Sequence, residues 1–175
     1  TLPRVPEDLS PSDVVMTGAE VLAEGPPEAL THFVQQGGGW MGMFGGAAKA
    51  LPALFGAQPT PAGPASELRV MFRNAEHPLA RRLPDAVYLR GLYQALETTA
   101  EHTETLLYAD WRYQHSAVLV SRSVGAGRVA CTTLQDYGHP GFQQILYRIL
   151  VDLAGRSVGD RVLGVGLLGY SPFVG

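Results

Sequence analysis

Apolar residues recur along the chain with two spacings, one typical of helices and one typical of strands. Residues 26–38 carry apolar side chains at positions 29, 30, 33 and 34, which fall on one face of a helix. Residues 140–155 form a clearer helix, and in both segments a proline suits the first turn and a glycine suits the end. The predicted core face of the second helix consists of six residues: Phe142, Ile145, Leu146, Ile149, Leu150 and Leu153.

Unbroken apolar runs at 14–16, 41–43 and 129–132 predict buried strands. Such runs are expected where helices cover both faces of a parallel sheet. The first two runs flank the first predicted helix, and a β-α-β unit joins parallel strands by a right-handed crossover. Further strands are predicted at 67–72, 86–90, 104–109 and 116–123, with a hairpin turn at 124–127. The pattern predicts an α/β fold with a mainly parallel sheet.

The composition narrows the class of protein. A chain of 175 residues with 46% hydrophobic residues suits one domain with a real core. The net charge of −3 and the lack of a basic stripe argue against a nucleic-acid partner. No apolar run approaches the ~20 residues of a membrane span, so no membrane partner is expected. Cys131 is the single cysteine, which fits a reducing, cytoplasmic location, and its place in a strand pattern predicts a small core residue.

Three stretches, in this order, resemble the trehalose-utilisation (ThuA-like) family: "ALTHFVQQGGGWMGMFGG", "HPLARRLPD" followed by "LY", and "GAGRVACTTL". The resemblance covers residues 13–155 and implies a role in carbohydrate metabolism. It also implies the class I glutamine amidotransferase-like fold, a flavodoxin-like three-layer sandwich with a mainly parallel sheet. That family usually opens with one more strand and helix, for which this chain has little room. We therefore expect a truncated or irregular N-terminus.

The sequence departs from this family at three polar positions. Phe44 stands where ThuA-like proteins often have histidine and where amidotransferases have their cysteine nucleophile. Arg90 and Gly91 replace an Asp-Glu pair, and Gln135 and Asp136 replace a Gly-His pair. A nucleophile must be a serine, cysteine or threonine that a base activates. The turn after Phe44 is therefore interpreted as an elbow without its nucleophile, and no glutaminase activity is expected.

The C-terminal tail resembles a different family. Its sequence, "RVLGVGLLGYSPFVG", is similar to the first strand and turn of the glucose–fructose oxidoreductase and inositol dehydrogenase family. If the phosphate loop follows the strand, Gly169 and Ser171 form a partial dinucleotide-binding motif. The resemblances imply a ThuA-like domain at 1–157 and, at 158–175, a linker with the first strand of a following oxidoreductase domain. NAD(P) is then a cofactor of that following domain, and no cofactor is predicted within this chain.

The predicted ligand site lies where strands end, because open α/β sheets bind ligands outside the carboxyl ends of their strands. Phe44 and Gly45 follow one such strand, and Tyr93 follows the strand "AVYLR". Three residues are candidates for acid–base catalysis: His115, Asp136 and His139. The alternative for these three side chains is a structural role in which they only cap loops, and no metal site is predicted.

Three functions are open from the sequence. The first is a ThuA-like domain without amidotransferase catalysis, attached to a sugar-type oxidoreductase, that assists assembly or binds a sugar-like ligand. The second is an enzyme that acts on a carbohydrate-like small molecule by acid–base chemistry. The third is a non-catalytic protein-interaction domain, because the stretch 38–57 exposes apolar surface if its helix packs elsewhere. The expected partners are the sugar-like molecule, the following domain and a second copy of the chain in a homo-oligomer.

Overall fold

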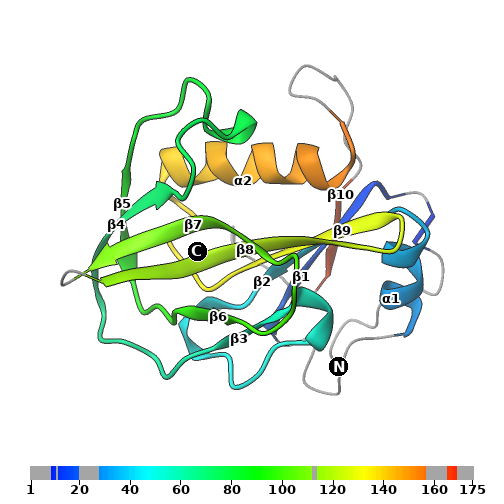
Figure 1. Cartoon of the computed structure of the whole chain (residues 1–175), viewed down its shortest axis with the longest axis horizontal. Helices are drawn as coiled ribbons and strands as arrows, with labels where there is room; N and C mark the ends of the chain where they lie inside the picture. Colours follow the sequence, from blue (N-terminus) through cyan, green and yellow to red (C-terminus); the bar gives the residue numbers. More distant parts are fainter. Residues whose placement is uncertain (1–8, 11, 20–27, 112–113, 157–164, 169–175) are drawn as a thin grey trace.

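The computed structural model describes residues 9–10, 12–19, 28–111, 114–156 and 165–168. Its main feature is an eight-stranded sheet in the order β10-β1-β2-β9-β8-β7-β4-β5 (Figure 1). These strands are β1 (Val14–Gly18), β2 (Gly39–Met43), β4 (Ser66–Phe72), β5 (Val87–Gly91), β7 (Glu104–Trp111), β8 (Gln114–Val124), β9 (Gly127–Thr132) and β10 (Val165–Leu168). A smaller sheet pairs β3 (Ala57–Pro59) with β6 (Leu96–Thr98). The helices are α1 (Glu28–Gln35) and α2 (Pro140–Leu153), with short 3-10 helices η2 (Gly45–Ala47), η3 (Ala53–Phe55) and η4 (Pro78–Ala80).

The sheet is mixed, so the prediction of a flavodoxin-like three-layer sandwich with a mainly parallel sheet is wrong. Strands β10, β1, β2 and β9 are parallel neighbours, whereas antiparallel pairings join β9, β8, β7, β4 and β5. The physical reason is connection length, because a parallel pair needs a crossover of about a dozen residues or more. Only residues 112–113 separate β7 from β8, and only residues 125–126 separate β8 from β9. Two α-helices in the described residues are also too few to cover both faces of so wide a sheet.

The parallel half of the sheet agrees with the sequence pattern. Strands β1, β2 and β9 lie side by side, with Val14 opposite Gly39 and Gly39 opposite Arg128. Every residue of β1 and β2 is buried, which confirms the prediction of buried strands there. Helix α2 buries its predicted core face except Leu150, which is half-buried, and buries Val151 as well. Of the helices that the structure describes, none is long and apolar enough to span a membrane.

Side chains of the parallel strands alternate between two cores, one on each face of the sheet. Val14 belongs to the core that packs against α2, and Val15 belongs to the core that packs against α1. Trp40 is the largest residue of the second core and is 0% exposed. Its Nε1–H donates a hydrogen bond of 2.9 Å to Thr17 Oγ1, and its ring centroid lies 4.5 Å from that of Phe55. These contacts hold β2 in place just before the predicted ligand site.

The described part of the C-terminal tail extends the sheet of this domain. Strand β10 is the edge strand parallel to β1, with Val165 opposite Val14 and Leu168 opposite Thr17. Gly169 and Ser171 lie outside the described residues. The domain boundary at residue 157 and the nucleotide-binding domain after it stay predictions.

Candidate functional site

A cavity of about 310 Å³ opens at the carboxyl ends of the parallel strands. The ends of β1 and β2 and the loop after β9 surround it. Its lining residues are Gly18, Ala19, Met43, Phe44, Gly45, Gln135 and Tyr137. Phe44 and Gly45, which the sequence places at a ligand site, therefore both line a cavity at the edge where open α/β sheets bind ligands.

Phe44 occupies the position from which an elbow nucleophile would project. It is 6% exposed and packs edge-on against Phe55, with ring centroids 5.3 Å apart. Gly42 makes room for this ring, because a Cβ at that position would overlap it. The backbone of Phe44 has φ −90° and ψ −19°, and the left-handed residue is Gly45, with φ +64°. The turn therefore lacks both the nucleophile and the backbone strain of a nucleophile elbow.

The three segments where the sequence departs from the ThuA-like pattern meet beside this cavity. A Cβ on Gly45 would lie 2.6 Å from Nε2 of Gln135, so the Gln135 amide covers Gly45. A Cβ on Gly91 would lie 3.9 Å from the Cβ of Gln135. Asp136 Oδ2 accepts a hydrogen bond of 3.1 Å from the backbone N–H of Arg90. Three strands lie between β9 and β5 in the sheet. Because β5 nevertheless contacts the loop after β9, the sheet must curl.

Asp136 and His139, two of the three acid–base candidates, are held in structural contacts. Asp136 makes the backbone contact just described. His139 is the N-cap residue of α2, and its Nδ1 accepts a hydrogen bond of 3.2 Å from the backbone N–H of Gly141. Neither residue lines the cavity. Together the two side chains fix the loop that carries Gln135 and Tyr137 between β5 and α2.

Tyr93 and His115 also lie outside the cavity lining. Tyr93 is 7% exposed in the core that contacts α2, and its ring covers Gly63, where a Cβ would lie 2.8 Å from it. His115 is exposed on β8 and contacts Tyr108 edge-on, with ring centroids 5.0 Å apart. The structure therefore brings Phe44 and Gly45 to the cavity and does not gather the three acid–base candidates there.

Gln135 and Tyr137 supply the polar side chains of the cavity, and neither is among the ligand-site residues predicted from the sequence. Tyr137 is half-buried, and its ring stacks beside that of Phe142 on α2, with centroids 6.2 Å apart and planes 21° apart. Gln143 Nε2 donates a hydrogen bond of 2.8 Å to the Tyr137 carbonyl. Both cavity residues follow the buried strand β9 within a few positions. The rule that selects Phe44 at a strand's carboxyl end would have selected them too.

Cys131, the single thiol, is not available as a nucleophile. It is 0% exposed in β9, and burial raises the pKa of the Cys131 thiol far above its ordinary value. The reactive thiolate form is therefore not populated in the folded protein at neutral pH. Within the described part of the chain, no three His, Cys, Asp or Glu side chains are grouped as metal ligands.

Alkaline pH is expected to destabilise the fold through this thiol. The unfolded chain releases the Cys131 proton above about pH 8.5, whereas the folded chain keeps it. The free energy of unfolding therefore falls as pH rises, by up to about 1.4 kcal/mol per further pH unit. Urea unfolding of the wild type and of Cys131→Ala at a series of alkaline pH values measures this slope. The variant should show the shallower slope, and two equal slopes would contradict the burial of an un-ionised thiol.

No family model matches this sequence, and no curated protein matches it in sequence. Solved structures match in fold. A ThuA-like protein from Parabacteroides merdae has a TM-score of 0.64 and 16% identity, over 89% of this chain and 75% of that one. A cytoplasmic protein from Salmonella typhimurium has a TM-score of 0.59 and 16% identity, over 85% of this chain and 76% of that one.

A β-galactosidase from Bacillus circulans sp. alkalophilus matches with a TM-score of 0.63 and 19% identity. That match covers 86% of this chain but spans only 24% of the enzyme. Identities this low establish the fold alone. The chain therefore has the fold of the ThuA-like proteins, with a mixed sheet at its centre.

Proposed function

We propose that this chain is a ThuA-like domain that binds a small carbohydrate in the cavity beside Phe44 and has no amidotransferase activity. The observation that carries the proposal is the lining of that cavity. It offers aromatic rings and an amide, and its described lining residues include no thiol, imidazole or carboxylate. A site without a nucleophile or an acid–base pair supports binding in preference to chemistry.

The lining suits a hydroxyl-rich ligand. The Gln135 amide carries both a carbonyl acceptor and an N–H donor. The ring of Tyr137 is oriented by its stacking beside Phe142. An oriented ring next to an amide offers an apolar surface to the C–H face of a sugar and hydrogen bonds to its hydroxyls. A volume of about 310 Å³ is near the lower end for ligand cavities, so we expect the site to hold one sugar ring.

The wider role that we propose is in carbohydrate metabolism, as a domain joined to a sugar-type oxidoreductase whose own domain binds NAD(P). The tail's resemblance to that oxidoreductase family supports this role, as does the likeness to ThuA-like proteins and to part of a β-galactosidase. An enzyme that acts through His115, Asp136 and His139 has less support, because none of these side chains lines the cavity.

Titration calorimetry with glucose, galactose and trehalose tests the binding proposal. We expect at least one of these sugars to bind. Tyr137→Ala should weaken that binding about tenfold, because an aromatic contact contributes on the order of 1 kcal/mol beyond its buried area. Tyr147→Ala is the matched control, since Tyr147 is 48% exposed on α2 and does not line the cavity.

Failure of all three sugars to bind, or equal binding by Tyr137→Ala and the wild type, would contradict the carbohydrate site. The lack of amidotransferase activity is tested separately by measuring ammonia release from glutamine. We expect none from the purified protein. Ammonia release that Cys131→Ala abolishes would overturn that expectation.

A further inference from the structure

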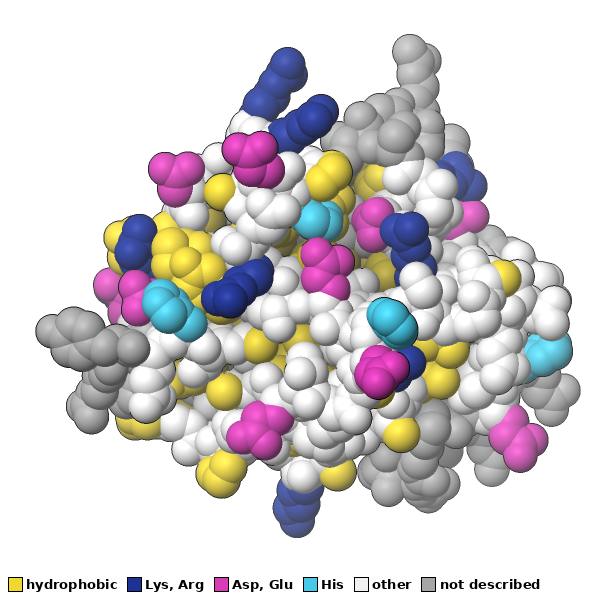
Figure 2. Space-filling model, in the orientation of Figure 1, with side chains coloured by type: hydrophobic (Ala, Val, Ile, Leu, Met, Phe, Trp, Pro, Cys, Tyr) yellow, Lys and Arg dark blue, Asp and Glu magenta, His cyan; other side chains and the backbone are white. Residues whose placement is uncertain are grey.

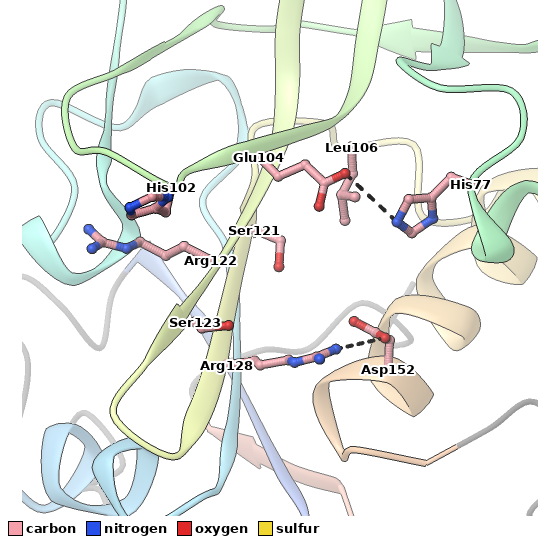
Figure 3. A pocket seen from close by; sticks show the side chains of 9 residues that line it. All are labelled: His77, His102, Glu104, Leu106, Ser121, Arg122, Ser123, Arg128 and Asp152. Atoms are coloured by element: carbon pink, nitrogen blue, oxygen red, sulfur yellow. Dashed lines mark hydrogen bonds and ion pairs between the residues drawn. The ribbon is translucent and has the colours of Figure 1, made fainter.

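A second cavity, of about 280 Å³, lies at the opposite end of the parallel strands, between α2 and the sheet face formed by β7, β8 and β9. Five polar side chains surround its open centre in Figure 3: His77, Glu104, Ser121, Arg128 and Asp152. None of them belongs to the cavity beside Phe44. The charges and hydrogen bonds of these five groups indicate what kind of ligand this second cavity suits.

The sheet face beneath α2 changes from apolar to polar at this cavity. Leu119 and Ala130 are 0% exposed in the core that packs against α2. Ser121 lies two residues after Leu119 in β8, and Arg128 lies two residues before Ala130 in β9. Alternate residues of a strand share a face, so Ser121 and Arg128 lie on the α2 side of the sheet. Glu104 is paired with Ser121 on the neighbouring strand, so the polar row continues onto β7. Figure 2 shows acidic, basic and histidine side chains close together between α2 and β7–β8.

The Glu104 carboxylate faces the cavity without a close cationic partner among the described residues. The Nε2 of His77 lies 3.8 Å from Glu104 Oε1, too far for a hydrogen bond. Nδ1 of His77 accepts a hydrogen bond of 3.2 Å from the backbone N–H of Leu79. The neutral imidazole therefore carries its proton on Nε2, on the side of Glu104. The Glu104 side chain is 58% exposed, so a ligand can reach its oxygens.

Ser121, Arg128 and Asp152 complete the group of five, and the cavity is also lined by His102, Leu106, Arg122 and Ser123. Ser121 Oγ donates to a backbone carbonyl of β9 at 3.1 Å, which leaves its lone pairs for a ligand. Arg128 and Asp152 neutralise each other through an ion pair of 2.9 Å, which uses one oxygen of the carboxylate. Arg122 also borders the cavity, but its Nη1 lies only 2.9 Å from the position of a Cβ on Gly56. That places the Arg122 guanidinium on the other face of the strand from Ser121.

We infer that this second cavity binds the protonated primary amine of a small hydroxylated molecule, with the ammonium group on Glu104. An ammonium donates three hydrogen bonds, and a hydrogen bond between two charged groups is about twice as strong as a neutral one. Hydroxyl groups of the same ligand match the Ser121 acceptor and the His77 Nε2–H donor. An anionic ligand is disfavoured by the Glu104 carboxylate, because the charge of Asp152 is already neutralised by Arg128. The inference does not depend on the carbohydrate site beside Phe44.

Glucosamine is a suitable probe, and N-acetylglucosamine is its neutral counterpart, because acetylation removes the ammonium charge and keeps the ring. Glucosamine should bind at millimolar concentration in an NMR titration at neutral pH. Glu104→Gln, which removes the charge at nearly constant size, should weaken that binding about tenfold, as should acetylation of the probe. Glu97→Gln is the matched control, because Glu97 is exposed on β6 and its replacement causes the same change in net charge.

Tyr137→Ala separates the two cavities, since glucosamine binding at Glu104 should survive it. Glu104 is exposed, so its replacement should leave the thermal unfolding temperature unchanged. Four results would overturn the inference: no glucosamine binding, equal binding of both sugars, unchanged affinity in Glu104→Gln, or loss of glucosamine binding in Tyr137→Ala.

Discussion

Replacing Trp40 by alanine is expected to lower the free energy of unfolding by about 3–5 kcal/mol. Trp40 is 0% exposed, bonds to Thr17 through its indole N–H and packs against Phe55. Alanine leaves a large cavity in this core and removes the buried partner of the Thr17 hydroxyl. Phe55 also packs against Phe44, so the substitution loosens one wall of the proposed ligand site.

Urea unfolding measures this loss, with Trp40→Phe as the control. Phenylalanine keeps an aromatic ring in the core but cannot donate to Thr17, so its loss should be smaller, about 1–3 kcal/mol. If Trp40→Ala were no less stable than Trp40→Phe, the packing of this ring would not be what stabilises β2.

A loss of about 3 kcal/mol is expected for Gly127→Ala, because overpacking against rigid neighbours forces the backbone to move. Gly127 begins β9, directly after the hairpin turn, where the chain passes close to the end of α1. A Cβ at this position would overlap the carbonyl oxygens of Val34 and Gly38. Both are backbone atoms and cannot rotate aside, so the segment between α1 and β2 would have to shift.

Gly138→Ala is the matched control for this substitution. A Cβ on Gly138 meets nothing within 4 Å, so the variant should stay within about 0.5 kcal/mol of the wild type. Chemical denaturation of both variants and the wild type provides the comparison. Equal stability of the two variants would mean that β9 does not approach the end of α1 as closely as described.

The parallel half of the fold can be predicted from the sequence, and the direction of the remaining strands is harder to predict. The runs at 14–16 and 41–43 are unbroken and flank a helix, which specifies parallel neighbours. The resemblance to ThuA-like proteins favours parallel pairing for the remaining strands as well. The two-residue connection at 125–126 outweighs it, because so short a link can join only antiparallel strands. Connection length is therefore the signal that separates this mixed sheet from a flavodoxin-like one.

The place of the candidate site can also be predicted, but the long-range contact that fixes the loop beside it cannot. The carboxyl-end rule selects Phe44, which lines the cavity. The contact between Asp136 and the backbone of Arg90 joins residues 46 positions apart, and no local pattern predicts it. His139 is a different case, because the Pro140 after it marks the first turn of a helix and so places His139 at the N-cap. Its capping role could have been read from the sequence.

The cavity beside Phe44 is expected to bind a carbohydrate without performing chemistry on it. The most direct measurement is an amide chemical-shift map of the isotope-labelled protein, titrated with the sugar that binds in calorimetry. The largest shifts should fall on Gly18, Gly45, Gln135 and Tyr137, and the spectrum of the sugar should stay unchanged during prolonged incubation. Largest shifts elsewhere on the domain, or conversion of the sugar, would contradict the claim.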